Sequence, residues 1–142
     1  MDQDKEDIKK FILKSPHMYF YSGVPNARDL ISGLCQEAIA EGSERVIVEK
    51  NEGWWFLYSS KDWISELGVQ KYFSQPLRFD VGASGGTRTG VLVSVFASDV
   101  TFYKNEEEIV IKGEAASSNK LPNKHGCCIA FKIENTGLLI SA

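Results

Sequence analysis

An abrupt change of apolar periodicity between residues 41 and 45 constrains the fold more than any other feature of the sequence. Residues 27–41 carry an apolar stripe at helical spacing, made by Leu30, Ile31, Leu34, Cys35, Ala38 and Ile39. Asn26 is suited to cap this helix, and Gly42 to end it. β-branched residues then dominate residues 45–50, and the tight turn Asn51-Glu52-Gly53 leads into a second strand at residues 54–59. A helix followed directly by a β-hairpin predicts a fold that contains both kinds of element.

The rest of the chain continues this mixture. The patterns predict a helix at residues 4–14, a short helix or irregular stretch at 61–73, a glycine-rich loop at 82–90, and strands at 99–104, 108–113, 127–134 and 138–141. Residues 91–98 are compatible with a strand or with two helical turns. We expect one domain over residues 1–142, an α+β two-layer sandwich with helices on one face of a mixed or mostly antiparallel sheet.

Composition limits the class of protein. The 142 residues are 43% hydrophobic and 25% charged, which is typical of a globular domain. A net charge of −3 argues against broad nucleic-acid binding, which needs a basic surface, and is compatible with a basic protein partner. The three cysteines form no disulfide framework, so we expect them to be reduced. The acidic start is not a signal peptide, and no apolar run is long enough for a membrane span, so we expect a cytoplasmic protein.

Four segments carry a family resemblance. They are Lys14 to Tyr19, the helix from Leu30 to Glu41, the glycine-rich stretch from Ser84 to Gly90, and Lys124 to Phe131. In this order, and over nearly the whole chain, they resemble the ATP-binding domain of DNA gyrase B and its relatives, the GHKL group. The resemblance implies that group's α+β fold, with a helix at residues 91–98.

The departures from the family fall on its chemistry. In the family's motif helix a glutamate activates water and an asparagine four residues later holds magnesium. Here the matching positions are Gly33 and Glu37. Loss of the general base costs roughly 10²–10⁴ in rate. Glu37 could ligate magnesium, but without a metal its charge would repel a triphosphate.

The adenine-binding segment departs in the same way. The family's aspartate and two glycines correspond here to Ser59, Lys61 and Trp63. Ser59 could accept a weaker hydrogen bond, whereas Lys61 and Trp63 would fill the space that the glycines leave. If the nucleotide pocket is retained, its lining would be Glu37, Ser59, Gly85, Gly86, Arg88 and Gly90. The alternative is a flexible glycine loop with a solvated arginine.

No catalytic or metal site is expected. His17 and His125 lie far apart without a ligand pattern around them, and zinc needs three or four convergent ligands. The serines have no recognisable base partner or nucleophile elbow. We therefore predict no catalytic residues, no metal and no cofactor.

Aromatic and acidic residues supply candidates for a partner surface. Trp54 and Trp55 point to opposite faces of a strand, so one is exposed unless both faces are covered, and exposed tryptophan is enriched in binding hot spots. With them we group Trp63 and the acidic Glu106 and Glu107 at a hairpin tip. The alternatives are a lid or helix that covers both tryptophans and a solvated acidic turn.

These features lead to a ranked set of functions. The sequence favours a non-catalytic protein-binding module on a disabled GHKL-like scaffold, such as an inhibitor or immunity protein or a regulatory subunit. The second hypothesis is a nucleotide or small-molecule sensor that binds without hydrolysis. An enzyme with an unfamiliar site ranks last.

Overall fold

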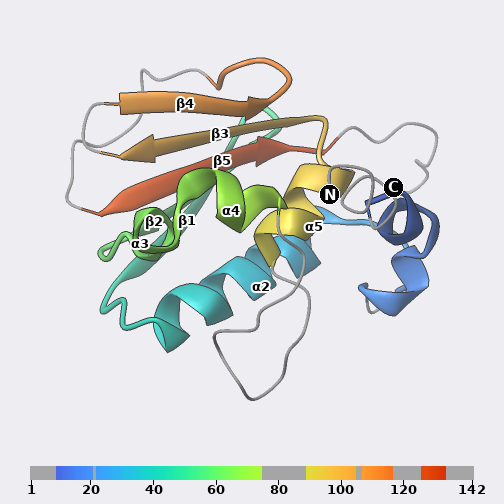
Figure 1. Ribbon diagram of the computed structural model, residues 1–142, viewed down its shortest axis with the longest axis horizontal. Coiled ribbons are helices and arrows are strands. Elements are labelled where there is room, and N and C mark those ends of the chain that lie inside the picture. The colour runs from blue at the N-terminus through green and yellow to red at the C-terminus, as the bar shows by residue number, and fades with distance from the viewer. Residues whose placement is uncertain (1–8, 21, 75–88, 105–106, 117–125, 134–142) are drawn as a thin grey trace.

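The computed structural model describes residues 9–20, 22–74, 89–104, 107–116 and 126–133 (Figure 1). Residues 9–14 are helical. The elements that follow are η1 (Pro16–Met18), α2 (Ala27–Ala40), β1 (Val46–Asn51), β2 (Trp54–Ser59), α3 (Trp63–Leu67), α4 (Val69–Ser74), α5 (Thr89–Phe96), β3 (Asp99–Lys104), β4 (Glu107–Lys112) and β5 (Cys127–Lys132).

The described strands form one antiparallel sheet in the order β1-β2-β5-β3-β4. β1 and β2 are joined by a two-residue turn in which Glu52 and Gly53 have φ values of 53° and 87°. Two successive positive φ angles match the right-handed twist of the flanking strands, so this turn holds the hairpin in register. The later strand β5 inserts between β2 and β3, which leaves β1 and β4 at the two edges.

The helices pack against one face of this sheet (Figure 1). The larger core lies between them, and it contains Leu30 and Leu34 of α2, Tyr72 of α4, Val93 of α5, and Phe102 of β3. A smaller cluster on the opposite face consists of sheet residues and Ala116. The expectation of an α+β fold with a mostly antiparallel sheet is therefore confirmed for the described residues.

The ambiguous segment is a helix, and it starts earlier than expected. α5 begins at Thr89 and ends at Phe96, and the N–H of Ala97 still donates to Val93 O. Thr89 and Gly90 form the first turn of this helix instead of ending a glycine loop. Burial of α5 between α2, α4 and β3 outweighs the strand preference of its β-branched residues.

The apolar stripe of α2 differs from the predicted one at two positions. Ile39 is 62% exposed, whereas Glu37 is buried, with only 7% of its surface exposed. The buried face is centred on Leu34 and Ala38, and Ile39 points away from it. Other boundaries shift by one or two residues, and the predicted strand at residues 138–141 lies outside the described part of the chain.

Candidate functional site

Glu37 lies where three helices meet. Its carboxylate accepts a hydrogen bond from the Tyr72 hydroxyl of α4 and another, at 2.8 Å, from the backbone N–H of Thr89 in the first turn of α5. Burial and the adjacent carboxylate raise the pKa of the Tyr72 phenol well above its usual value. A carboxylate at the start of a helix satisfies a free N–H group and complements the helix dipole. Glu37 therefore connects α2 to α4 and α5 inside the protein.

Two glycines let these helices approach closely. A Cβ atom at Gly33 would lie 2.7 Å from Thr89 Oγ1, and one at Gly90 would lie 2.3 Å from Tyr72 Cε2. Both distances are shorter than real Cβ contacts, so the backbones of α2 and α5 are in direct contact with the neighbouring side chains. No space for a ligand group is left between Gly33 and Thr89 or between Gly90 and Tyr72.

Ser59, at the end of β2, belongs to a hydrogen-bonded corner. It is 2% exposed, and its hydroxyl lies 2.8 Å from Ser43 Oγ and donates to Lys61 O at 2.7 Å. Ser60 continues the network by accepting from the backbone N–H groups of Glu44 and Arg45. The hydroxyl of Ser59 thus holds the local backbone.

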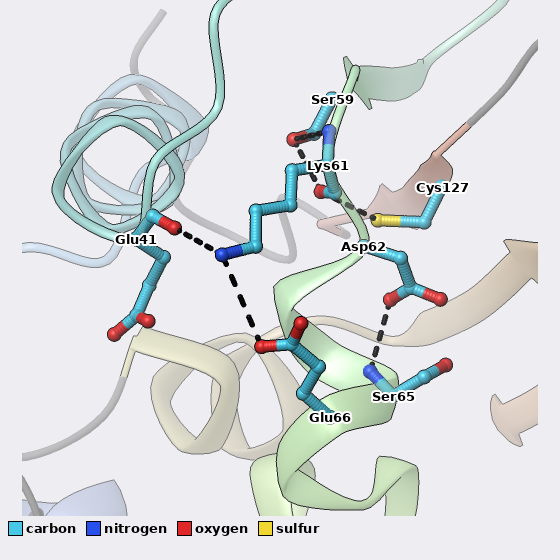
Figure 2. A network of polar contacts seen from close by, with 7 residues as sticks. All are labelled: Glu41, Ser59, Lys61, Asp62, Ser65, Glu66 and Cys127. Atoms are coloured by element: carbon cyan, nitrogen blue, oxygen red, sulfur yellow. Dashed lines mark hydrogen bonds and ion pairs between the residues drawn. The ribbon is translucent and has the colours of Figure 1, made fainter.

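Figure 2 shows how this corner joins three elements. Lys61 Nζ donates to Glu41 O at the C-terminus of α2, at 2.8 Å, and lies 4.0 Å from the Glu66 carboxylate of α3. Asp62 caps α3 by accepting from the N–H of Ser65 at 2.9 Å. A lysine near a helix C-terminus stabilises the free carbonyl groups there. The residues from 59 to 62 therefore turn the chain from β2 into α3.

The face of the sheet on which the described residues place no helix, called the helix-free face below, carries an aromatic cluster. Phe56 and Tyr58 stack with their ring centroids 6.4 Å apart, and Tyr103 and Cys128 pack beside them. Trp54 and Tyr58 remain partly exposed at the border of this cluster. The Tyr58 hydroxyl is buried and has no hydrogen-bond partner within the described residues. This face therefore offers partly exposed aromatic surface from Trp54 and Tyr58.

Acidic side chains flank the same face. Glu49 of β1 is directly opposite Phe56 in the register, and Glu108 of β4 is directly opposite Tyr103. Both glutamates are exposed. Burial raises the pKa values of Tyr58 and Tyr103, and Glu49 and Glu108, respectively, raise them further. The aromatic cluster thus has negative charge at both edges of the sheet.

The residues predicted to bind a partner do not form one group. Trp55 lies on the helix side, where Lys50 Nζ is 5.1 Å from its ring centre. Trp63 is 5% exposed and belongs to the core, so it is not part of the surface. Glu107 is exposed on β4. Gly85, Gly86, Arg88 and Glu106 lie outside the described residues.

The residues predicted to line a nucleotide pocket are placed in two regions. Glu37 and Gly90 lie together beside Tyr72, whereas Ser59 lies in the separate corner at the end of β2. Within the described ranges, no group of three or more His, Cys, Asp or Glu side chains could hold a metal ion. In the same part of the chain, no helix is both long and apolar enough to cross a membrane.

The chain was compared with known proteins in three ways. No protein-family model, no curated protein and no solved structure matches it. The function therefore has to be inferred from the residues and their geometry.

Sequence reasoning missed two residues that define the interior site. Tyr72 and Thr89 meet Glu37 across 35 and 52 positions of the chain. No local pattern indicates such a contact. A partial signal was the position of Glu37 three residues after Leu34 and seven after Leu30, which places it next to the apolar stripe of α2.

Proposed function

We propose that this chain is a non-catalytic protein-binding module built on a GHKL-like ATPase scaffold that no longer turns over nucleotide. It would act as an inhibitor or immunity protein, or as a regulatory subunit of a larger assembly. One observation carries the proposal: Glu37 and Ser59, two side chains that the resemblance places in the nucleotide pocket, are already hydrogen-bonded within the protein. The proposal rests on the contacts of these side chains, because a fold alone does not specify a function.

Glu37 is the strongest case. The resemblance gives its position to a magnesium ligand, but its carboxylate accepts hydrogen bonds from Tyr72 and from the N–H of Thr89. To bind a metal it would have to leave two buried donors without a partner, and each would cost about 1–3 kcal/mol. The arrangement therefore supports a structural role for this residue.

The other matching positions point the same way. Gly33 has no side chain to activate water, and Thr89 packs directly over it. The Ser59 hydroxyl is engaged by Ser43 and Lys61, and the Trp63 side chain fills the core beside Tyr72, with ring centroids 6.0 Å apart. An adenine would have to displace these contacts.

The partner surface that the structure favours is the helix-free face of the sheet. Trp54 and Tyr58 supply partly exposed aromatic area. Glu49 and Glu108 place negative charge on either side. Aromatic anchors with a charged rim are typical of protein interfaces, and this charge suits a basic partner.

Copurification with matched variants tests the partner. A tagged chain is expressed at native level, and the protein that copurifies with it is identified. The amount of this protein is then compared with the amount that copurifies with Trp54→Thr, Glu108→Lys and Glu66→Lys. Glu66 is an exposed acid on the helix side, so its reversal is the control. The proposal expects a partner that survives Glu66→Lys and is lost or weakened at least tenfold by the other two. A partner that is equally retained by all three variants contradicts the assigned face.

Calorimetric titration with magnesium–ATP and magnesium–ADP tests whether the scaffold has lost its use of nucleotide. We expect no binding heat. Micromolar binding that disappears in Glu37→Gln would instead support the sensor hypothesis, because it would show that this carboxylate faces a ligand.

A further inference from the structure

Among the described strands, β1 lies at an open edge of the sheet. Its only strand partner in the described structure is β2. The four central residues, 47–50, are exposed, and they include Ile47 at 44% and Val48 at 38%. An edge strand of this kind presents unpaired backbone groups that can template another strand.

The free backbone groups of β1 can be assigned to particular residues. Arg45 O accepts from the N–H of Ser60, so the backbone of Arg45 faces β2. Residues of an antiparallel strand alternate in the side to which their N–H and C=O groups point. Ile47 and Glu49 therefore also face β2, and the groups of Val46, Val48 and Lys50 face outward.

The sequence around this edge is complementary to itself when two copies of it pair antiparallel. Residues 44–50 read Glu-Arg-Val-Ile-Val-Glu-Lys. When the segment is paired antiparallel with a copy of itself about Ile47, Arg45 meets Glu49, Glu44 meets Lys50, and Val46 meets Val48. Each charge then faces an opposite charge and each apolar residue an apolar one.

We propose that β1 pairs with β1 of a second copy of this chain, antiparallel about a twofold axis at Ile47, so that one sheet runs through both copies. The interface is isologous, as in most homodimers. The outward-facing N–H and C=O groups of Val46 form hydrogen bonds with those of Val48 in the second copy. By the twofold symmetry, Val48 forms the same hydrogen bonds with Val46 of the second copy. Ile47 faces its own equivalent in a position without backbone hydrogen bonds, where side chains come closest.

The two faces of the joint sheet are consistent with this register. Ile47 and Glu49 pair with Tyr58 and Phe56 of β2, so they lie on the helix-free face, where the Arg45–Glu49 pairs also form. Val46 and Lys50 lie on the helix side. Opposite-charge and β-branched pairs directly across two strands both stabilise an antiparallel sheet.

The other edge is less suited to the same role. The pairing of β4 with β3 shifts register between Val100 and Thr101, as at a β-bulge or similar irregularity. Lys112 at the end of β4 is also engaged, because its ammonium donates to Ser94 O at 2.9 Å. Bulges twist an edge away from further pairing.

Charge reversal tests the register with a built-in rescue. Sedimentation velocity of the 142-residue chain should show a monomer–dimer equilibrium. Arg45→Glu alone, or Glu49→Arg alone, places like charges opposite each other twice per dimer, and we expect about a tenfold or greater rise in the dissociation constant. Mixing the two variants restores opposite charges at both places, so the mixture should dimerise like the native chain.

Arg45 and Glu49 are both exposed, so neither substitution disturbs the core, and circular dichroism of each variant verifies that it is folded. A native chain that stays monomeric at its highest soluble concentration overturns the proposal. So does a dimer that Arg45→Glu leaves unchanged, or variants that fail to rescue each other although both are folded.

Cross-linking tests the location. Ile47→Cys should form an intermolecular disulfide under mild oxidation, since residues facing each other across the twofold axis have Cβ atoms within reach. Val110→Cys on β4, an equally exposed position at 45%, is the control and should not cross-link. Cross-linking through Val110→Cys but not Ile47→Cys would assign the contact to β4 and refute the β1 pairing.

Discussion

Replacing Glu37 with alanine tests whether the buried carboxylate is a structural centre. The substitution leaves two buried donors without an acceptor, the Tyr72 hydroxyl and the N–H of Thr89. Each orphaned donor costs about 1–3 kcal/mol, so the free energy of unfolding should fall by about 2–6 kcal/mol. Small domains are stable by only about 5–15 kcal/mol, so this loss is a large share of the total.

Urea denaturation measures the effect. The fluorescence of Trp63 is a local reporter, because its ring lies 6.0 Å from that of Tyr72. With an m value of about 2 kcal/mol per molar urea, the midpoint should fall by about 1–3 M. Gln36→Ala is the control, because Gln36 is the exposed neighbour on the same helix and should change stability by less than about 0.5 kcal/mol.

A double-mutant cycle adds a second readout. Tyr72→Phe removes one of the two donors, so its cost should be largely absent when Glu37 is already alanine. If Glu37→Ala destabilises no more than Gln36→Ala, or if the two substitutions are additive, the carboxylate does not join α2 to α4. The proposed structural role of Glu37 would then be wrong.

Three further predictions concern other parts of the fold. Gly126→Ala should cost about 2–5 kcal/mol in urea denaturation, because its Cβ would lie 1.9 Å from a backbone oxygen. Gly53→Ala has the same φ of 87°, but its Cβ would meet only the flexible Lys132 side chain at 3.6 Å, so it should cost about 1–2 kcal/mol, and equal costs would contradict this reasoning. Burial raises the pKa values of Cys127 and Cys128, so the unfolded chain loses these thiol protons before the folded chain does as pH rises. The free energy of unfolding should therefore be constant below about pH 8 and fall above about pH 9 by roughly 1.4 kcal/mol per pH unit for each thiol. A profile of urea midpoints that stays flat up to about pH 10 would refute this. Lys61→Met removes the cation at the C-terminus of α2 and should lower the stability measured by thermal denaturation by about 0.3–1 kcal/mol. The stability difference between the wild type and this variant should become smaller at high salt, which screens the charge.

Local sequence patterns were sufficient for much of the fold. The helix at residues 27–40 was predictable because its cap, its apolar spacing and its glycine end lie within one short segment. The β1–β2 hairpin was predictable for the same reason, since a two-residue turn with glycine fixes the register of adjacent strands. The strand at residues 99–104 also has the predicted bounds.

The candidate site was only partly predictable. The sequence pointed to Trp54 as a partner residue, and this side chain is partly exposed on the helix-free face. It also pointed to Trp63, which is buried because α3 turns that side chain into the core. Exposure of an aromatic residue depends on which elements cover it, and a single strand or helix does not contain that information.

The sequence by itself determined the α+β class, the main helix, the hairpin and the self-complementary charge order of residues 44–50, because each depends on residues close together in the chain. Only the tertiary structure decided that residues 89–96 form a helix, that Glu37 is buried beside Tyr72, and that β1 lies at an edge. These properties depend on contacts between distant segments, whose energies of several kcal/mol exceed local propensities of less than about 1 kcal/mol per residue.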